Sequence, residues 1–275
     1  MSEEAVALPS IGAGDPGDGL VEELELTGLA RGPWQEDAAH GGAPAALIVR
    51  SAEAHSDGGA LRVASLNMSF YGPVLLGPVR IESETVKPGR RQRVVAVRLI
   101  SDGRVVIDAR AILIRRGRVD LPEGAAPAAE RLPGPETARE VDRSLWADGE
   151  GDAFHRNTNT VLALEGGPDR VGPTGSGWFR LDFPLVPGEI PSGAQRAAAA
   201  ADFGNGLAHP VAFGEFLFVN CDLNLSLLRE PDGEWIGLDS RTDVDPGGSG
   251  LTTTTLYDGT GRCGSASQIL YVDRA

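Results

Sequence analysis

Asp202, Thr242 and Gln268 are polar residues at positions where the surrounding pattern calls for small or apolar side chains. Asp202 directly follows five alanines, residues 197–201, a composition typical of a buried helix. Thr242 and Gln268 fall on the apolar faces of two strand-like segments, where an unpaired amide costs on the order of 1–3 kcal/mol. Together these groups could perform general base chemistry: a carboxylate accepts a proton from water, and a hydroxyl and an amide hold that water in place.

Alternation of side chains along a strand assigns the faces. In RVVIDARAILI, residues 104–114, the set predicted to face inward is Ile107, Ala109, Ala111 and Leu113. In WIGLDSRT, residues 235–242, the inward set is Ile236, Leu238, Ser240 and Thr242. Ser240 therefore competes with Thr242 for the same role.

The chain repeats itself, and the repeat explains why these positions matter. Residues 66–114 align without a gap with residues 223–271, with identities that include Asn67/Asn224, Ser83/Ser240 and Thr85/Thr242. Both copies carry Pro/Gly and Asp-Gly turns between β-rich runs, as in antiparallel hairpins. On this alignment Gln268 replaces Ala111, and a helix alignment places Asp202 opposite Ser51. We therefore expect one site, retained in the second copy and lost from the first.

Each copy is predicted to contain an upstream strand, a helix and an antiparallel meander of strands. The predicted helices lie in HGGAPAALIVRSAEAH, residues 40–55, and PSGAQRAAAAADFGNG, residues 191–206. The segment between the copies is rich in Pro, Ala and charge, a composition suited to a linker on the surface. The expected architecture is α+β, with a first unit at residues 17–120, a linker at 121–148 and a second unit at 149–275.

A sheet wrapped around one long helix is the hotdog arrangement, and here a family resemblance enters. The chain resembles the double-hotdog acyl-CoA thioesterases of the thioesterase II type through HGGAPAALIVR, the PGRR turn, AAADFGNG and SRTDVDPGGSGLTTTTLYDGTGRCGSASQ. The resemblance implies two tandem hotdog units and hydrolysis of a fatty or other acyl-CoA thioester, without cofactor or metal. It also implies that Asp202, Thr242 and Gln268 correspond to the Asp, Thr and Gln of the family's active site.

Substrate contacts are expected at two further segments. His40-Gly41-Gly42 opens the first helix, and the backbone N–H near Gly42 would polarise the thioester carbonyl. His40 either bonds the substrate or caps the helix. Arg90 and Arg91, in the basic turn KPGRRQR, either grip the phosphates of coenzyme A or stand at a solvated hairpin tip. The acyl chain is expected to run between helix and sheet.

Composition restricts the partners. The net charge of −14 argues against nucleic acid as a partner, and no apolar run is long enough to span a membrane. The acidic N-terminal segment lacks the pattern of an export signal, so we expect a cytoplasmic protein with Cys221 and Cys263 both free. The chain is expected to act on an acyl-CoA substrate and, as is common for this fold, to form homo-oligomers.

Two other functions fit the same residues. A hotdog protein could bind an acyl-CoA or another acyl ligand without hydrolysing it. An enoyl-thioester hydratase is less favoured, because Asp37 and His40 lack the surrounding pattern expected of a hydratase pair. The sequence has no GxSxG nucleophile motif, so a serine hydrolase is not indicated.

Overall fold

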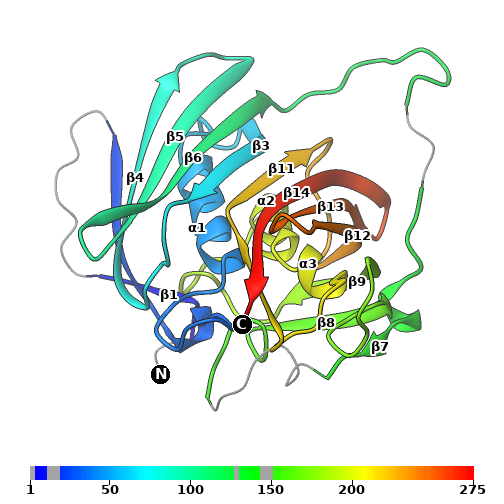
Figure 1. Cartoon of the computed structure of the whole chain (residues 1–275). Helices are drawn as coiled ribbons and strands as arrows, with labels where there is room; N and C mark the ends of the chain where they lie inside the picture. The colour runs from blue at the N-terminus through cyan, green and yellow to red at the C-terminus, as the bar shows by residue number, and fades with distance from the viewer. Residues whose placement is uncertain (1–3, 11–18, 127–129, 143–150) are drawn as a thin grey trace.

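The fold is one antiparallel sheet that curls around two helices (Figure 1). The computed structural model describes residues 4–10, 19–126, 130–142 and 151–275. The strands of the first half are β1 (Ala7–Pro9), β2 (Leu20–Leu26), β3 (Leu61–Phe70), β4 (Gly77–Lys87), β5 (Gln92–Ser101) and β6 (Arg104–Arg115). Those of the second are β7 (Arg139–Glu140), β8 (Asn159–Glu165), β9 (Thr174–Leu181), β10 (Phe216–Asn220), β11 (Asp222–Leu227), β12 (Trp235–Asp245), β13 (Ser249–Asp258) and β14 (Gly261–Arg274).

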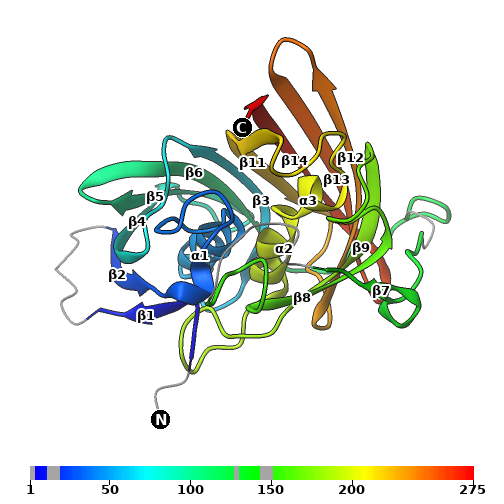
Figure 2. The ribbon, with the colours of Figure 1, turned by 60° about the horizontal axis from the view of Figure 1, so that its bottom comes forward.

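The helices lie inside the curl of the sheet. They are α1 (Gly42–Glu53), α2 (Gly193–Ala201) and the short α3 (Gly204–Leu207), with 3-10 turns at Gly28–Ala30 and Pro135–Thr137. α1 packs against α2, and each also contacts the strands of its own half (Figure 2). The predicted α+β double hotdog is confirmed. Within the described residues, none of these helices combines the length and apolar character needed to cross a bilayer.

The two copies meet where equivalent strands pair, β3 of the first copy antiparallel with β11 of the second. In the sheet order β1-β2-β4-β5-β6-β3-β11-β14-β13-β12-β9-β8-β7, the centre is the pairing of β3 with β11. Asn67 is the register partner of Asn224, its own counterpart in the repeat, and Asn67 Nδ2 donates to Asn224 Oδ1 at 2.8 Å. A pseudo-twofold axis therefore passes between these two asparagines, and the single chain is built as a symmetric dimer would be.

The predicted strand faces and turns agree with the structure. Ile107, Ala109, Ala111 and Leu113 are all at most 1% exposed, and Thr242 and Gln268 are buried on the corresponding face of the second half. The turn between β5 and β6 has φ of 50° at Asp102 and 70° at Gly103, the left-handed geometry of a two-residue hairpin. The repeat therefore predicts both the strand order and which side chains face the helices.

The predicted linker lies against the second half over part of its length. Within its described residues, β7 pairs with β8, and the indole Nε1 of Trp178 donates to the carbonyl of Pro133 at 2.7 Å. These contacts fasten the segment to strands of the second half. The expected composition of a surface linker therefore coexists with specific backbone and side-chain contacts.

The close packing of α1 on α2 depends on small residues. The alanines at this contact are fully buried: Ala43, Ala45 and Ala46 of α1, and all five at 197–201 in α2. At Gly42 there is no room for a side chain: an added Cβ would lie 2.6 Å from the backbone oxygen of Ala199 and 3.1 Å from Phe154 Cε1. The start of α1 therefore touches the backbone of α2 directly.

Gly42→Ala is expected to lower the free energy of unfolding by about 1–3 kcal/mol, because the two helices have to separate. That loss corresponds to roughly 2–4 °C in Tm for each kcal/mol in a chain of this size. Gly117→Ala is the matched control, since an added Cβ there meets nothing within 4 Å. Thermal melts of both variants check this, and a Gly42→Ala protein that melts with the control would contradict the packing described.

A buried carboxylate fastens the turn between β13 and β14. Asp258 is 2% exposed and accepts hydrogen bonds from the Arg229 guanidinium, from the backbone N of Asp232 at 2.8 Å and from Thr260 Oγ1 at 2.7 Å. Burial alone would raise the pKa of Asp258, but these donors outweigh it and hold the pKa well below its usual range. The ionised carboxylate therefore stabilises the fold at neutral pH.

Asp258→Asn is expected to cost about 1–3 kcal/mol at pH 7, since charge-assisted bonds are lost from a buried site. A carboxyl group whose pKa is lowered by folding stabilises the folded state at pH values above its unfolded pKa of about 3.9. This stabilisation is lost as the pH falls from there toward the lower pKa of the folded state. The difference between wild type and variant should therefore shrink below about pH 4. Urea melts between pH 7 and 3 measure it.

Asp243→Asn is the matched control for Asp258→Asn, because the side chains of Asp243 and its partner Arg241 are 60% and 58% exposed. An exposed ion pair contributes little, so this variant should unfold with the wild type. Equal losses in the two variants, or a difference at Asp258 that grows on acidification, would overturn the assignment.

Candidate active site

Asp202 is a buried carboxylate in an unfavourable place. It is the C-cap residue of α2 and is only 5% exposed. Burial removes its hydration, and the last carbonyls of a helix carry partial negative charge, so both effects oppose an ionised side chain there. The preference of Asp for helix ends therefore does not explain this residue, and an ionised side chain here requires specific hydrogen-bond partners.

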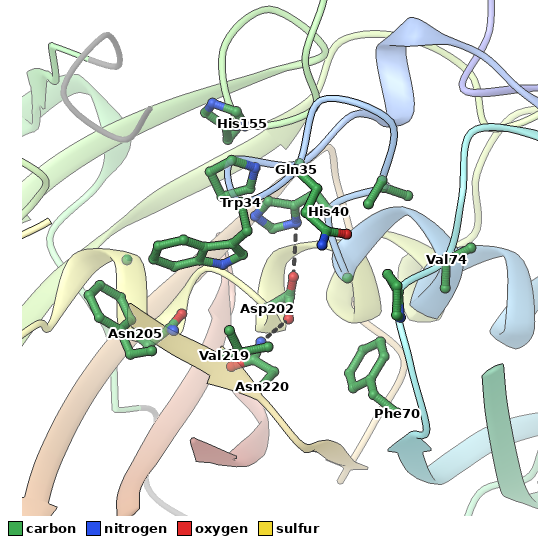
Figure 3. Close-up of a pocket in the computed structure, with 18 of the residues that line it drawn as sticks. Trp34, Gln35, His40, Phe70, Val74, His155, Asp202, Asn205, Val219 and Asn220 are labelled. Atoms are coloured by element: carbon green, nitrogen blue, oxygen red, sulfur yellow. Dashed lines mark hydrogen bonds and ion pairs between the residues drawn. The ribbon is translucent and has the colours of Figure 1, made fainter. Parts of the chain in front are cut away.

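Three side chains from three different elements supply those partners, and two of them, His40 and Asn220, are drawn in Figure 3. Asn220, the last residue of β10, donates through Nδ2 to Asp202 Oδ1. Gln268 Nε2, on β14, lies 3.4 Å from the same oxygen, and His40 Nδ1 lies 2.8 Å from Oδ2. Both carboxylate oxygens are thus engaged, and the structure brings together Asp202 and Gln268 as the sequence predicted.

His40 is placed between two partners and can serve only one of them with the same nitrogen. Its Nδ1 lies 2.8 Å from Asp202 Oδ2 and 3.1 Å from the backbone N of Gly42. An ionised carboxylate only accepts hydrogen bonds, so with Asp202 ionised the His40 proton sits on Nδ1. The N–H of Gly42 is then without its imidazole acceptor. Stacking of the His40 ring on Phe203, with centroids 4.6 Å apart, holds this orientation.

Gly41 allows the start of α1 to reach the carboxylate. An added Cβ at Gly41 would lie 2.9 Å from Asp202 Oδ2 and 3.0 Å from Phe70 Cζ. Any side chain here would displace the carboxylate or the phenyl ring. The predicted segment His40-Gly41-Gly42 therefore lies directly beside Asp202.

A cavity of about 490 Å³ opens onto this centre. Its walls come from the loop before α1, the segment that follows β3, α3 and β10, and they include Asp202, His40, Asn220, Trp34 and Phe70 (Figure 3). None of the described residues that line it is Lys or Arg. The cavity can therefore take an acyl group and the uncharged end of a carrier, while phosphate groups would remain outside it.

The structure does not bring Thr242 to this centre. Its hydroxyl is bonded to Thr252 Oγ1 at 2.8 Å, and Thr252 is the register partner of Gln268 on the next strand. Thr242 does face inward as predicted, but β12 is two strands from β14, and alternation identifies the face without the lateral distance. The competing Ser240 is likewise bonded elsewhere, to Thr254 Oγ1 at 2.9 Å.

Arg90 and Arg91 lie at the opposite end of α1 from the cavity. Their turn joins β4 to β5, and neighbouring Arg93 bonds Asp57 and the carbonyl of His55, just beyond the C-terminus of the helix. His40-Gly41-Gly42 lies at the N-terminus, and twelve helical residues span about 18 Å. The structure therefore separates this basic turn from Asp202, and its reading as a solvated hairpin tip is the one the geometry favours.

Asn220 is the partner of Asp202 that the sequence analysis missed. Shifted by the same 157 residues as the rest of the repeat, it corresponds to Val63, which is 1% exposed on the inward face. The next residue, Cys221, interrupts the strand between β10 and β11, and the register of β3 breaks at the equivalent place, between Val63 and Ser65. A repeat alignment extended three residues upstream of Leu66 would have shown a polar residue replacing a buried Val.

The equivalent position in the first half is closed. Ser51, Val63 and Ala111 stand where the second half has Asp202, Asn220 and Gln268. An added Cβ at Gly193, the counterpart of Gly42, would lie 2.1 Å from the carbonyl oxygen of Pro231, so backbone fills the entrance.

Polar groups of the first half near this closed position bond residues of the second half. The Glu53 carboxylate accepts from Ser192 Oγ at 2.7 Å and Gln195 Nε2 at 2.6 Å, and burial raises the pKa of Glu53. Arg62 donates to the carbonyls of Leu227 and Leu228 at 3.2 Å and 2.8 Å. These bonds satisfy the polar groups internally, so the arrangement around Asp202 is present in the second copy alone among the described residues.

Solved structures of other proteins share this fold. A structure assigned as a thioesterase II from Thermobifida fusca YX is 21% identical, with a TM-score of 0.70 over 95% of this chain and 94% of that one. A conserved hot dog protein from Alicyclobacillus acidocaldarius is 17% identical, with a TM-score of 0.69 over 95% and 96%. The tesB protein of Mycobacterium avium subs paratuberculosis is 17% identical, with a TM-score of 0.65 over 92% and 93%. These likenesses establish the fold.

The family assignment comes from sequence models. A search of curated protein sequences found no significant match. A model of the acyl-CoA thioesterase N-terminal domain matches residues 30–114, and a model of the acyl-CoA thioesterase C-terminal domain matches residues 122–272. The second match alone covers more than half of the chain. The protein therefore belongs to the acyl-CoA thioesterase family and is a thioester hydrolase.

Proposed function

We propose that this thioester hydrolase cleaves acyl-CoA thioesters with a water molecule activated by Asp202. The observation that carries the proposal is the Asp202 carboxylate itself, buried at the end of a helix yet held by three side chains and open to the cavity. A charge kept in such a place at a cost in stability is typical of a catalytic group. Asp202 acts as the general base.

The neighbouring amides keep the base in position. Asn220 and Gln268 donate to Oδ1, and His40 donates to Oδ2, which leaves the remaining lone pairs for a water in the cavity. Asn220 takes the place for which the sequence suggested Thr242. Water attacks the thioester carbonyl as its proton passes to Asp202. The C–O bond forms, the C–S bond then breaks, and the thiolate leaves and is protonated.

The start of α1 supplies the electrostatic partner for the carbonyl oxygen. With the His40 proton directed at Asp202, the N–H of Gly42 loses its imidazole acceptor and, next to the cavity-lining Gly41, becomes the candidate donor to the thioester carbonyl. The positive end of the α1 dipole adds to this interaction as negative charge develops. Gly42 is therefore the proposed oxyanion donor, and His40 orients the base while freeing that donor.

Asp202→Asn is expected to reduce kcat for butyryl-CoA by about 10²–10⁴-fold, since it removes the base while preserving side-chain volume. Asn220→Ala and Gln268→Ala should each cost about 10²-fold or less, because they loosen the base without removing it. Release of free thiol at saturating substrate measures all three variants.

Thr242→Val is the matched control, because Thr242 is as buried as Gln268 but is bonded to Thr252 instead of to the Asp202 centre. It should turn over butyryl-CoA within a few-fold of wild type. Full activity in a folded Asp202→Asn protein would overturn the base assignment. A large loss in Thr242→Val with an active Asn220→Ala would restore the sequence-based choice of Thr242.

A further inference from the structure

The part of the cavity beyond Asp202 is walled by aromatic rings. Trp34 and Phe213 face each other with centroids 6.4 Å apart and planes 25° from parallel. Phe218 meets Trp34 edge-on at 5.2 Å and lies 4.8 Å from Phe213. We call these three residues the aromatic pocket. All three line the same cavity as the carboxylate.

The aromatic pocket has two fixed walls and one adjustable wall. His209 packs on Phe213 at 4.6 Å, and Phe218 is 3% exposed within a small cluster with Leu270 and Val272. Trp34 is 40% exposed and belongs to the loop before α1. Trp34 is therefore the ring of the three that is least held by its surroundings, and a bound group would pack on the cavity side of this ring cluster.

The space between helix and sheet, where the sequence analysis expected the acyl chain, is filled. The alanines of α2 at 197–201 are 0% exposed, and Phe154 and Phe179 close the same region at 0%. Phe203 packs on Phe179 at 5.1 Å and on Phe154 at 6.1 Å. An acyl group that reaches Asp202 is therefore directed into the cavity and away from the interior of the second hotdog.

The size of the cavity limits what it can hold. A cavity of about 150 Å³ accommodates one benzene, so 490 Å³ corresponds to about three such rings. The thioester and the adjoining end of the carrier arm need part of this volume. What remains suits one ring with a short linker.

One polar group also faces the aromatic pocket. Asn205, on α3, is 9% exposed and lines the cavity beside Trp34 and Val219 (Figure 3). Within the described part of the chain its amide has no side-chain hydrogen bond of its own. An amide open to the cavity can exchange a water for a polar substituent of the bound group.

From these features we infer that the acyl group of the preferred substrate is a single aromatic ring on a short linker, such as an arylacetyl group, with a ring hydroxyl that reaches Asn205. The ring lies against Trp34 and Phe213, and its thioester carbonyl lies at Asp202 and Gly42. Offset aromatic contacts of this kind contribute beyond the burial of area. This inference rests on the proposed function, because it extends the same site.

The test compares thiol release from acetyl-, butyryl-, octanoyl-, palmitoyl-, phenylacetyl- and 4-hydroxyphenylacetyl-CoA. The wild type is expected to show its highest kcat/KM with the two aryl esters. Trp34→Ala should lower kcat/KM for these by about 10-fold or more, with the butyryl ester changed less than threefold. Asn205→Ala should remove the advantage of the hydroxylated ester over phenylacetyl-CoA.

Trp235→Ala is the control for loss of a tryptophan. Trp235 lies on β12, where Arg180 stacks on its ring at 4.9 Å, and it is not among the residues that line the cavity. It should leave the ranking of the esters unchanged. Phe213→Leu, a milder change on the fixed wall, provides a second variant should Trp34→Ala fail to fold.

Thioesters of the same acyl groups with N-acetylcysteamine test recognition of the acyl group without the nucleotide, because these thioesters lack the adenine ring. The loss in Trp34→Ala should persist with the aryl N-acetylcysteamine esters. If Trp34→Ala instead weakens every CoA ester equally and no N-acetylcysteamine ester, the pocket holds adenine and the inference fails. A kcat/KM that rises with chain length to palmitoyl overturns it while leaving the proposed function intact. Release from no ester overturns the proposed function itself.

Discussion

The arrangement of this protein depends on one buried charge, the carboxylate of Asp202 at the C-terminal end of α2. The dipole of its own helix opposes that charge, and the dipole of α1 compensates for it, because Gly41 brings the N-terminus of α1 against the carboxylate oxygens. This contact requires two helices that lie side by side and antiparallel, the start of α1 at the end of α2 and Glu53 at the start of α2, with almost no side chains between them. Glycine at the start of α1 and alanine throughout α2 satisfy that requirement, so the same small residues that pack the core also build the active site.

Duplication accounts for how such a site could arise without losing the fold. The axis between Asn67 and Asn224 relates the two halves, so each half has the same strand pairing at the centre of the sheet and the same contact with the helix of the other half. A single fold therefore offers two equivalent helix ends, and only one needs to carry the carboxylate. In the other, Ser51 bonds Ser83 at 2.9 Å and Glu53 bonds the start of α2, so the polar groups are satisfied internally. In the proposed mechanism, the first half thus contributes packing and the oxyanion donor, while the second contributes the base.

Most of the fold and half of the catalytic centre could be predicted from the sequence, and the failures have physical causes. The alternation rule placed Gln268 correctly because its face has only one helix end to meet. It misplaced Thr242 because alternation says nothing of distance across a sheet, and β13 lies between. Arg90 and Arg91 were misplaced because a basic turn does not reveal which end of the helix it adjoins. Asn220 was missed because the alignment of the copies began at Leu66, just after the irregularity that turns Asn220 toward Asp202.

The proposed chemistry and the proposed acyl recognition draw on partly different elements of the molecule. Asp202, Asn220, Gln268 and His40 project from elements that belong to the repeat or from the start of its helix. In the aromatic pocket, Trp34 and Phe213 come from loops, whereas Phe218 lies on β10, two residues before Asn220. A change at Trp34 or Phe213 would alter the shape offered to the proposed acyl group without changing the strands that carry Asn220 and Gln268, whereas a change at Phe218 or Leu270 would fall on those strands. Selectivity in this fold can therefore vary by loop substitution, whereas the position of Asp202 cannot vary without separating α1 from α2.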